Sequence, residues 1–105
     1  MELVKPTIGR IVHYILKTGE HRPAIIVRVW PGEYGNDEVK DGINVQILLD
    51  GGNDKAALRP PAGQEIRGVM GRVTEQECAT GSAWRTSVRY DGTGLMSGSW
   101  HWPER

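Results

Sequence analysis

Residues 43–52 read Ile-Asn-Val-Gln-Ile-Leu-Leu-Asp-Gly-Gly, and this stretch carries the strongest structural signal in the chain. Apolar side chains recur at every second position, namely Ile43, Val45, Ile47 and Leu49. Because side chains alternate between the two faces of a strand, this period of two predicts a β-strand with one face in a core. The Asp-Gly-Gly that follows predicts a turn ending the strand.

Two more strands are predicted on the N-terminal side of this one. Residues 23–30 (Pro-Ala-Ile-Ile-Val-Arg-Val-Trp) are almost continuously apolar and β-branched, which is typical of a strand covered on both faces. Residues 9–16 are similar, and residues 18–20 (Thr-Gly-Glu) predict the turn between the two strands. Residues 31–42, rich in Gly, Asn and Asp, predict an extended hairpin loop.

The C-terminal half predicts one helix and further strands. Residues 74–77 (Thr-Glu-Gln-Glu) have the form of a capping box, and Gly81 would end the helix. In residues 84–90 the alternation places Trp84, Thr86, Val88 and Tyr90 on one face, and Asp91-Gly92 ends that strand. Residues 69–73 predict a weaker strand and residues 99–102 a short terminal one, whereas the sequence of residues 50–68 predicts a long irregular stretch.

This pattern predicts the fold class. Five to six short strands with Gly-rich turns favour a mostly β protein, a small SH3-like or OB-like barrel of antiparallel strands with one short helix. At 105 residues the chain has room for a single β domain, spanning residues 1–105.

Composition bounds the classes of function and the compartment. Thirteen basic and thirteen acidic residues give a net charge of zero, which disfavours a protein whose main task is to coat nucleic acid but allows a small anionic ligand. A lone cysteine, Cys78, excludes an internal disulfide and fits a reducing compartment. Without an apolar leader or a membrane-length apolar run, the expected location is cytoplasmic, with no membrane partner.

No pattern of catalytic or metal-binding residues is visible in the sequence. The three histidines, His13, His21 and His101, are not spaced as metal ligands, and a structural role in a strand is expected for His13. Asp50 and Asp54 in Asp-Gly-Gly-Asn-Asp suit either a cation or ribose contact, or turn chemistry. The sequence therefore predicts a protein that is not an enzyme and has no cofactor, no metal site and no catalytic residue.

The C-terminal residues 98–105 (Gly-Ser-Trp-His-Trp-Pro-Glu-Arg) are the most unusual local feature. Trp100 and Trp102 would share one face of a strand, with His101 on the other, and could form an aromatic wall with Trp84 and Tyr90. Such a wall is either the core of a protein without Phe or a stacking platform assisted by an arginine. We expect Trp100 to be core and Trp102 or Trp84 to contact a ligand. The predicted ligand-binding residues are Arg28, Trp30, Trp84, Arg85, Tyr90 and Trp102.

Five blocks distributed along the chain match sequence motifs that are found together in other proteins. They are residues 6–14 (PTIGRIVHY), 22–27 (RPAIIV), 44–51, which contain NVQ and LDG, 84–88 (WRTSV) and 98–104 (GSWHWPE). In this order they resemble a large family of small uncharacterised phage and prophage proteins, which commonly end in Gly-Thr-Trp-His-Trp-Pro-Glu. The resemblance implies a virus-linked accessory protein that works in the cytoplasm of the bacterial host.

Three functions remain open at this point. The first is an accessory protein that binds and sequesters a small anionic, nucleotide-like ligand, like a sponge that counters host defence. The second is a protein-interaction module that blocks a host protein or forms a homo-oligomer, with Trp30-Pro31 or Pro60-Pro61 at the contact. The third is a nucleic-acid-binding barrel.

Overall fold

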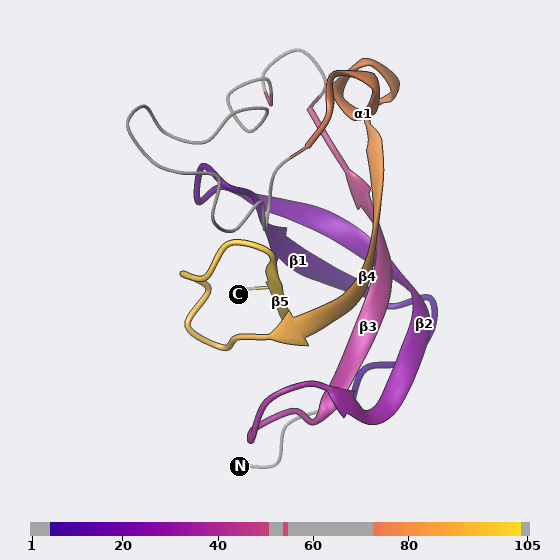
Figure 1. Ribbon diagram of the computed structural model, residues 1–105, viewed down its shortest axis with the longest axis vertical. Coiled ribbons are helices and arrows are strands. Elements are labelled where there is room, and N and C mark those ends of the chain that lie inside the picture. Colours follow the sequence, from indigo (N-terminus) through magenta and orange to yellow (C-terminus); the bar gives the residue numbers. More distant parts are fainter. Residues whose placement is uncertain (1–4, 51–53, 55–72, 104–105) are drawn as a thin grey trace.

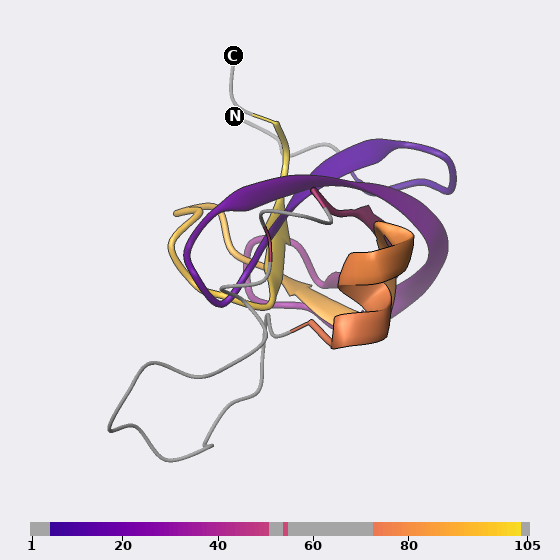
Figure 2. The same ribbon diagram turned by 90° about the horizontal axis from the view of Figure 1, so that it is seen from above.

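The computed structural model describes residues 5–50, residue 54 and residues 73–103. These residues form five strands and one helix: β1 (Ile11–Ile15), β2 (His21–Tyr34), β3 (Asp41–Leu48), α1 (Glu75–Thr80), β4 (Ser82–Tyr90) and β5 (Ser99–His101). The strands close into a barrel in the order β1-β2-β3-β4-β5 (Figures 1 and 2). The predicted mostly β barrel with one short helix is therefore confirmed.

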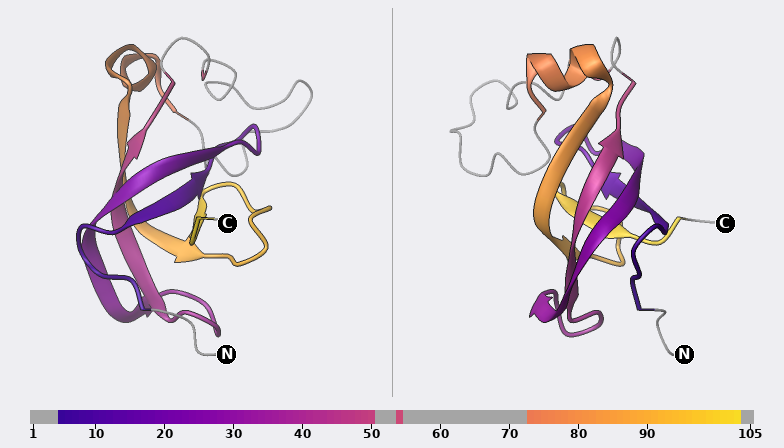
Figure 3. Two further views of the ribbon diagram at one scale, coloured as in Figure 1. Left: turned by 180° about the vertical axis from the view of Figure 1, so that it is seen from behind. Right: turned by 90° about the vertical axis from the view of Figure 1, so that its right-hand side faces the viewer.

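Strand order distinguishes the two predicted barrels. Each strand lies beside the next one in the sequence, and β5 closes the barrel by pairing antiparallel with β1. An OB barrel has a Greek-key order, so the observed order agrees with the SH3-like alternative. The short pairing of β4 with β5 is parallel, unlike the four other pairings. The gold segment between them loops out at one side of the barrel and returns to the end of β4, where β5 begins (Figure 3).

β2 differs from the prediction on two points. Its inner face is buried at Ala24 and Ile26, but Ile25 and Val27 are 37% and 41% exposed, so it is not covered on both faces. The reason is that no second layer covers the outside of the barrel here among the described residues. β2 also continues to Tyr34, with irregular pairing between Trp30 and Tyr34, so the predicted loop of residues 31–42 shrinks to residues 35–40.

A bulge in β4 overturns the predicted face of Trp84. Val45 pairs with Arg85 but Ile43 with Val88, so β4 has one extra residue between these two pairs. Ser87, inside this segment, has φ of 54°. An extra residue reverses the in–out alternation. Trp84 is consequently 50% exposed whereas Tyr90 is buried, and the two rings do not share a face.

A group of aromatic side chains forms part of the core. Trp100 is fully buried, with Tyr90 at 4.9 Å and Trp102 at 5.3 Å between ring centroids, both edge to face. Tyr14 is also buried, and the remaining core consists of smaller apolar side chains, among them Val12, Leu16, Ala24, Ile26, Ile43, Val45, Ile47 and Val88. The predicted alternation of β3 is confirmed at Ile43, Val45 and Ile47.

The helix begins and ends as predicted. Thr74 Oγ1 accepts a hydrogen bond from the Glu77 amide, and the Glu77 carboxylate accepts one from the Thr74 amide. Gly81 ends α1 in the left-handed conformation, with φ of 76°. Figure 1 shows α1 at one end of the barrel, beside the ends of β3 and β4. The one helix of the described residues is too short to cross a membrane.

We expect Thr74→Ala to lower the free energy of unfolding by about 1 kcal/mol, because the Glu77 amide loses its acceptor. Chemical denaturation of the variant and the unaltered chain measures this. Thr7→Ala is the matched control, since Thr7 is exposed and outside the helix. Equal losses in the two variants would show that the capping box does not stabilise α1.

The predicted strand at residues 69–73 lies outside the described residues except for Val73, which precedes α1 without strand structure. The Pro60-Pro61 contact also lies outside them, as does the irregular stretch of residues 50–68 apart from Asp50 and Asp54.

Candidate functional site

Three of the six predicted ligand-binding residues share the outer face of β2, β3 and β4. The Arg28 guanidinium lies 4.2 Å from the centroid of the Trp30 ring. Arg28 pairs with Asn44 on β3, and Trp84 pairs with Gln46 two residues further along that strand. Because residues two apart in a strand face the same way, Arg28, Trp30 and Trp84 face the same side of the sheet.

Arg85 is already occupied by a carboxylate. Its guanidinium donates two hydrogen bonds to Glu77, of 2.6 and 2.8 Å. These bonds raise the pKa of Arg85 and, against the opposing effect of burial, lower the pKa of Glu77. Arg85 therefore ties β4 to α1 and is not available to an anionic ligand.

Tyr90 and Trp102 belong to the barrel interior. Tyr90 is 6% exposed, and its burial, followed by the nearby negative charges of Glu38 and Asp91, raises its pKa. Trp102 is partly buried against the core, with the Arg10 guanidinium 5.1 Å from its ring centroid. Of the two interpretations of the aromatic wall, the structure shows the core for Tyr90 and Trp100, and Trp102 is partly buried against them.

A cleft that the sequence did not predict opens beside the end of β4. Its volume is about 270 Å³, and its lining residues are Tyr34, Ser87, Arg89, Met96, Gly98 and Ser99. Tyr34 and Ser87 are also the two non-glycine residues with positive φ among the described residues, at 63° and 54°. Such conformations are strained for residues with side chains and concentrate at binding sites. Two strained residues on one cleft make it the leading candidate for a binding site.

Neighbouring side chains hold the strained residues in place. The Trp30 ring meets Tyr34 edge to face at 5.6 Å, and Trp30 Nε1 donates to Asn44 Oδ1 at 2.8 Å. The same oxygen accepts from the Ser87 amide at 2.9 Å. A Cβ at Gly42 would lie 2.6 Å from Tyr34 Cβ, so only glycine permits this approach. Asn44 and Gly42 thus shape both walls of the cleft from β3.

Arg89 gives the cleft its positive charge. It is exposed and lies on β4 between buried Val88 and Tyr90. Arg22 and Arg85 form ion pairs, whereas no ion pair of Arg89 is found among the described residues. The lining also includes the hydroxyl groups of Tyr34 and Ser87, which are hydrogen-bond donors in addition to the guanidinium. The cleft can therefore hold an anionic group beside an aromatic ring.

The contacts of Asp54 show which of the two predicted roles the Asp50 and Asp54 carboxylates have. Its side chain is fully buried and forms a two-pronged ion pair with Arg22 of β2, with Arg22 Nε donating to Oδ2 at 2.9 Å. The Asp50 amide also donates to Asp54 Oδ2 at 2.7 Å. The carboxylate thus links Asp54 to Arg22 of β2, and turn chemistry describes only its contact with the Asp50 amide.

The residues that could hold a metal are the three histidines, which the sequence spacing did not suggest. His13, His21 and His101 come from β1, β2 and β5, and their candidate ligand atoms all lie within 4.8 Å of one another. Their ring centroids are 4.7 to 5.8 Å apart. We refer to these three residues as the histidine cluster.

Comparisons of the chain with protein-family models, with curated proteins and with solved structures find no match.

Proposed function

We propose that this protein is a non-enzymatic accessory protein of the phage type that binds and sequesters a small anionic, nucleotide-like ligand. The observation that carries the proposal is the cleft of about 270 Å³, whose lining combines Arg89 with the hydroxyl-bearing residues Tyr34 and Ser87. A guanidinium is suited to phosphate because its planar N–H groups match two oxygens at once.

The cleft also offers contacts for a planar group. Tyr34 is half exposed, and Met96 at the rim is 58% exposed, so an aromatic face and a polarisable thioether are both open to a ligand. Stacking on an aromatic side chain is tolerant of base identity. The volume lies just below the range of about 300–1,000 Å³ that is usual for small-molecule sites, so we expect one phosphate and one base of a ligand to enter rather than a polymer.

The test is a thermal-shift screen of the unaltered chain against cyclic dinucleotides, cyclic trinucleotides and cyclic ADP-ribose isomers. A ligand that binds only the folded chain raises Tm with concentration. Arg89→Ala removes one charge-assisted hydrogen bond, so we expect its affinity to fall about 10- to 150-fold, measured by calorimetric titration.

Arg28→Ala is the matched control, because it removes the same charge from the outer sheet face and not from the cleft lining. We expect its affinity to change less than about twofold. Loss of binding in Arg28→Ala with Arg89→Ala unaffected would move the ligand to Arg28 and Trp30. The absence of a shift with every compound at saturating concentration would contradict the proposal.

A second function, protein interaction or homo-oligomer formation, is favoured by apolar exposure on the outer face of β2, β3 and β4. Ile25 and Trp84 lie on either side of Gln46 on that face, and Trp84 is 50% exposed. Val27 and Leu48 add 41% and 48% exposed apolar side chains. Aromatic anchors of this kind are typical of interfaces. Trp84→Arg should abolish self-association measured by light scattering or capture of a host protein, while leaving the cleft intact.

The third function, nucleic-acid binding, differs from both in its dependence on salt. Binding to oligonucleotides should weaken steeply as salt rises, because each neutralised phosphate releases counterions. A flat response between low and moderate salt discards this alternative.

A further inference from the structure

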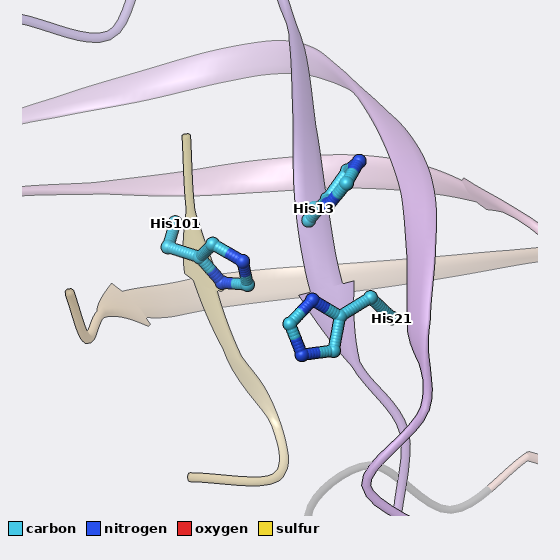
Figure 4. A group of neighbouring side chains, drawn as sticks. All are labelled: His13, His21 and His101. Atoms are coloured by element: carbon cyan, nitrogen blue, oxygen red, sulfur yellow. The ribbon is translucent and has the colours of Figure 1, made fainter. Parts of the chain in front are cut away.

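The pairing of the strands explains why three histidines distant in sequence meet. His13 and His101 are direct partners across the antiparallel β1–β5 ladder. His13 pairs with Pro23 on β2, and His21 is two residues from Pro23, so it faces the same side. Val12 and Tyr14 point into the core, which places all three histidines on the outside of the barrel wall. Figure 4 shows the rings of His21 and His101 extending toward each other in front of β1.

The segment between β4 and β5 covers this part of the wall. The Gly98 amide donates to the Ile15 carbonyl at 2.8 Å, which holds the segment against β1. A Cβ at Gly94 would lie 3.4 Å from Cε1 of both His21 and His101, so the backbone passes closely over the rings. His101 is therefore only 4% exposed, although it faces away from Trp100 as the alternation predicts. The cluster is sheltered, while His13 and His21 remain partly exposed.

The spacing of the ring nitrogens is close to what a metal ion requires. Zinc binds imidazole nitrogen at about 2.0–2.1 Å in tetrahedral geometry, which corresponds to about 3.3 Å between ligand nitrogens. The candidate atoms of the cluster all lie within 4.8 Å of one another. Rotations of the side chains about χ1 and χ2 that move each ring by about 1 Å therefore suffice to close the ligand set.

We propose that His13, His21 and His101 bind one divalent transition-metal ion of the zinc class. Neutral imidazole is a common ligand for zinc, copper, nickel and cobalt, whereas calcium and magnesium prefer oxygen. Three protein ligands leave a fourth position for water or another small ligand. The site is separate from the cleft, since no residue is shared between the cluster and the cleft lining.

A bound metal ion would also stabilise the closure of the barrel, because it would link β5 to β1 and β2. Its ligands come from β1, β2 and β5, and β5 is only three residues long. Because the ion binds the folded chain, Tm should rise with metal concentration. Binding should weaken as the pH falls, because each histidine must be neutral to coordinate the ion.

The test is a titration of the tag-free, metal-free chain with Zn²⁺ by calorimetry, and with Co²⁺ by visible absorption. We expect one ion per chain, a rise in Tm, and the d–d bands of a cobalt ion with nitrogen ligands. His13→Ala and His21→Ala should each weaken Zn²⁺ binding by on the order of 100-fold or more. The reason is that replacing even a residue that only hydrogen-bonds to a metal ligand lowers metal affinity about 10- to 100-fold. Cys78→Ser is the control, because it removes the only thiol of the chain, which lies on α1.

Histidine ring signals in nuclear magnetic resonance of the unaltered chain provide a second measurement that does not depend on how the variants fold. The chain has three histidines, so all three ring spectra should change on addition of one equivalent of Zn²⁺. Absence of saturable binding, unchanged ring signals, or equal affinity in the histidine variants would overturn the proposal. Arg89→Ala should bind Zn²⁺ normally, so failure of the metal site and failure of the cleft are distinguishable.

Discussion

Replacing Trp100 with alanine is expected to lower the free energy of unfolding by about 3–5 kcal/mol. The Trp100 side chain is fully buried and packs edge to face against Tyr90 and Trp102. Its removal leaves a cavity where β5 joins β1 and β4, and β5 is too short to collapse into the space without losing its pairing. For a small domain this loss is a large part of the total stability. Chemical denaturation measures it.

Two further variants separate the effect of the cavity from that of losing any tryptophan. Trp84→Ala should cost less than about 1 kcal/mol, because half of that side chain is exposed. Trp100→Phe should cost clearly less than Trp100→Ala, since it keeps a ring in the core. It also removes the Trp100 Nε1–H, a buried donor with no acceptor among the described residues. Similar losses in Trp84→Ala and Trp100→Ala would contradict the assignment of Trp100 to the core.

Local patterns in the sequence predicted those features that depend on neighbouring residues alone. The alternation in β3, the turn at Gly19, and the helix from Thr74 to Gly81 all have a physical cause within a few residues. A capping box depends only on four consecutive residues, so it can be recognised before the fold is known. The barrel as a class followed from the number and length of such strands.

The predicted aromatic wall failed at one position because alternation was extended through a bulge. Trp84 and Tyr90 are six residues apart and would share a face in a regular strand, but the extra residue near Ser87 reverses the pattern between them. Ser87 has no sequence signal for a positive φ, unlike Gly or Asn. Tertiary contacts select the bulge, in which Asn44 of β3 accepts from the Ser87 amide and the Thr86 hydroxyl.

The histidine cluster and the cleft could not be read from the sequence for a different reason. Residues His13 and His101 are 88 positions apart and meet because β5 closes the barrel against β1. Spacing rules for metal sites describe ligands within one loop or helix, and they carry no information about pairing across a barrel. With the strand order assumed, the alternation of side chains would have placed His13, His21 and His101 together on the outer face of neighbouring strands, and this would have indicated the cluster.

Replacing Asp54 with asparagine is expected to lower the free energy of unfolding by about 3 kcal/mol. The variant keeps the shape of the side chain but removes the charge that pairs with Arg22. Arg22 is only 17% exposed, and its remaining carboxylate partner is Glu20, whose side chain is 56% exposed. Breaking one side of a buried ion pair costs more than the pair is worth, because the other charge stays desolvated. Chemical denaturation at neutral pH measures the loss.

Two comparisons test that this loss belongs to the pair. Glu20→Gln should cost no more than about 1 kcal/mol, because it removes the exposed partner of Arg22. A double replacement of Arg22 and Asp54 by leucine should cost less than the sum of the single changes, since it leaves no unpaired charge. Additive losses would show that the two side chains do not stabilise each other.

Acid provides an independent check on the same carboxylate. Burial raises the pKa of Asp54, but the hydrogen bonds from Arg22 and the Asp50 amide outweigh it, so the pKa lies below its ordinary value of 3.8. A carboxyl group with a lower pKa in the folded chain stabilises the fold at pH above its unfolded value, and this contribution is lost as the pH falls toward the folded value. The difference in unfolding free energy between the unaltered chain and Asp54→Asn should therefore be constant near neutral pH and shrink below about pH 4. A difference that persists unchanged in acid would mean that the Asp54 charge does not contribute, and that the variant loses stability through its altered hydrogen bonds.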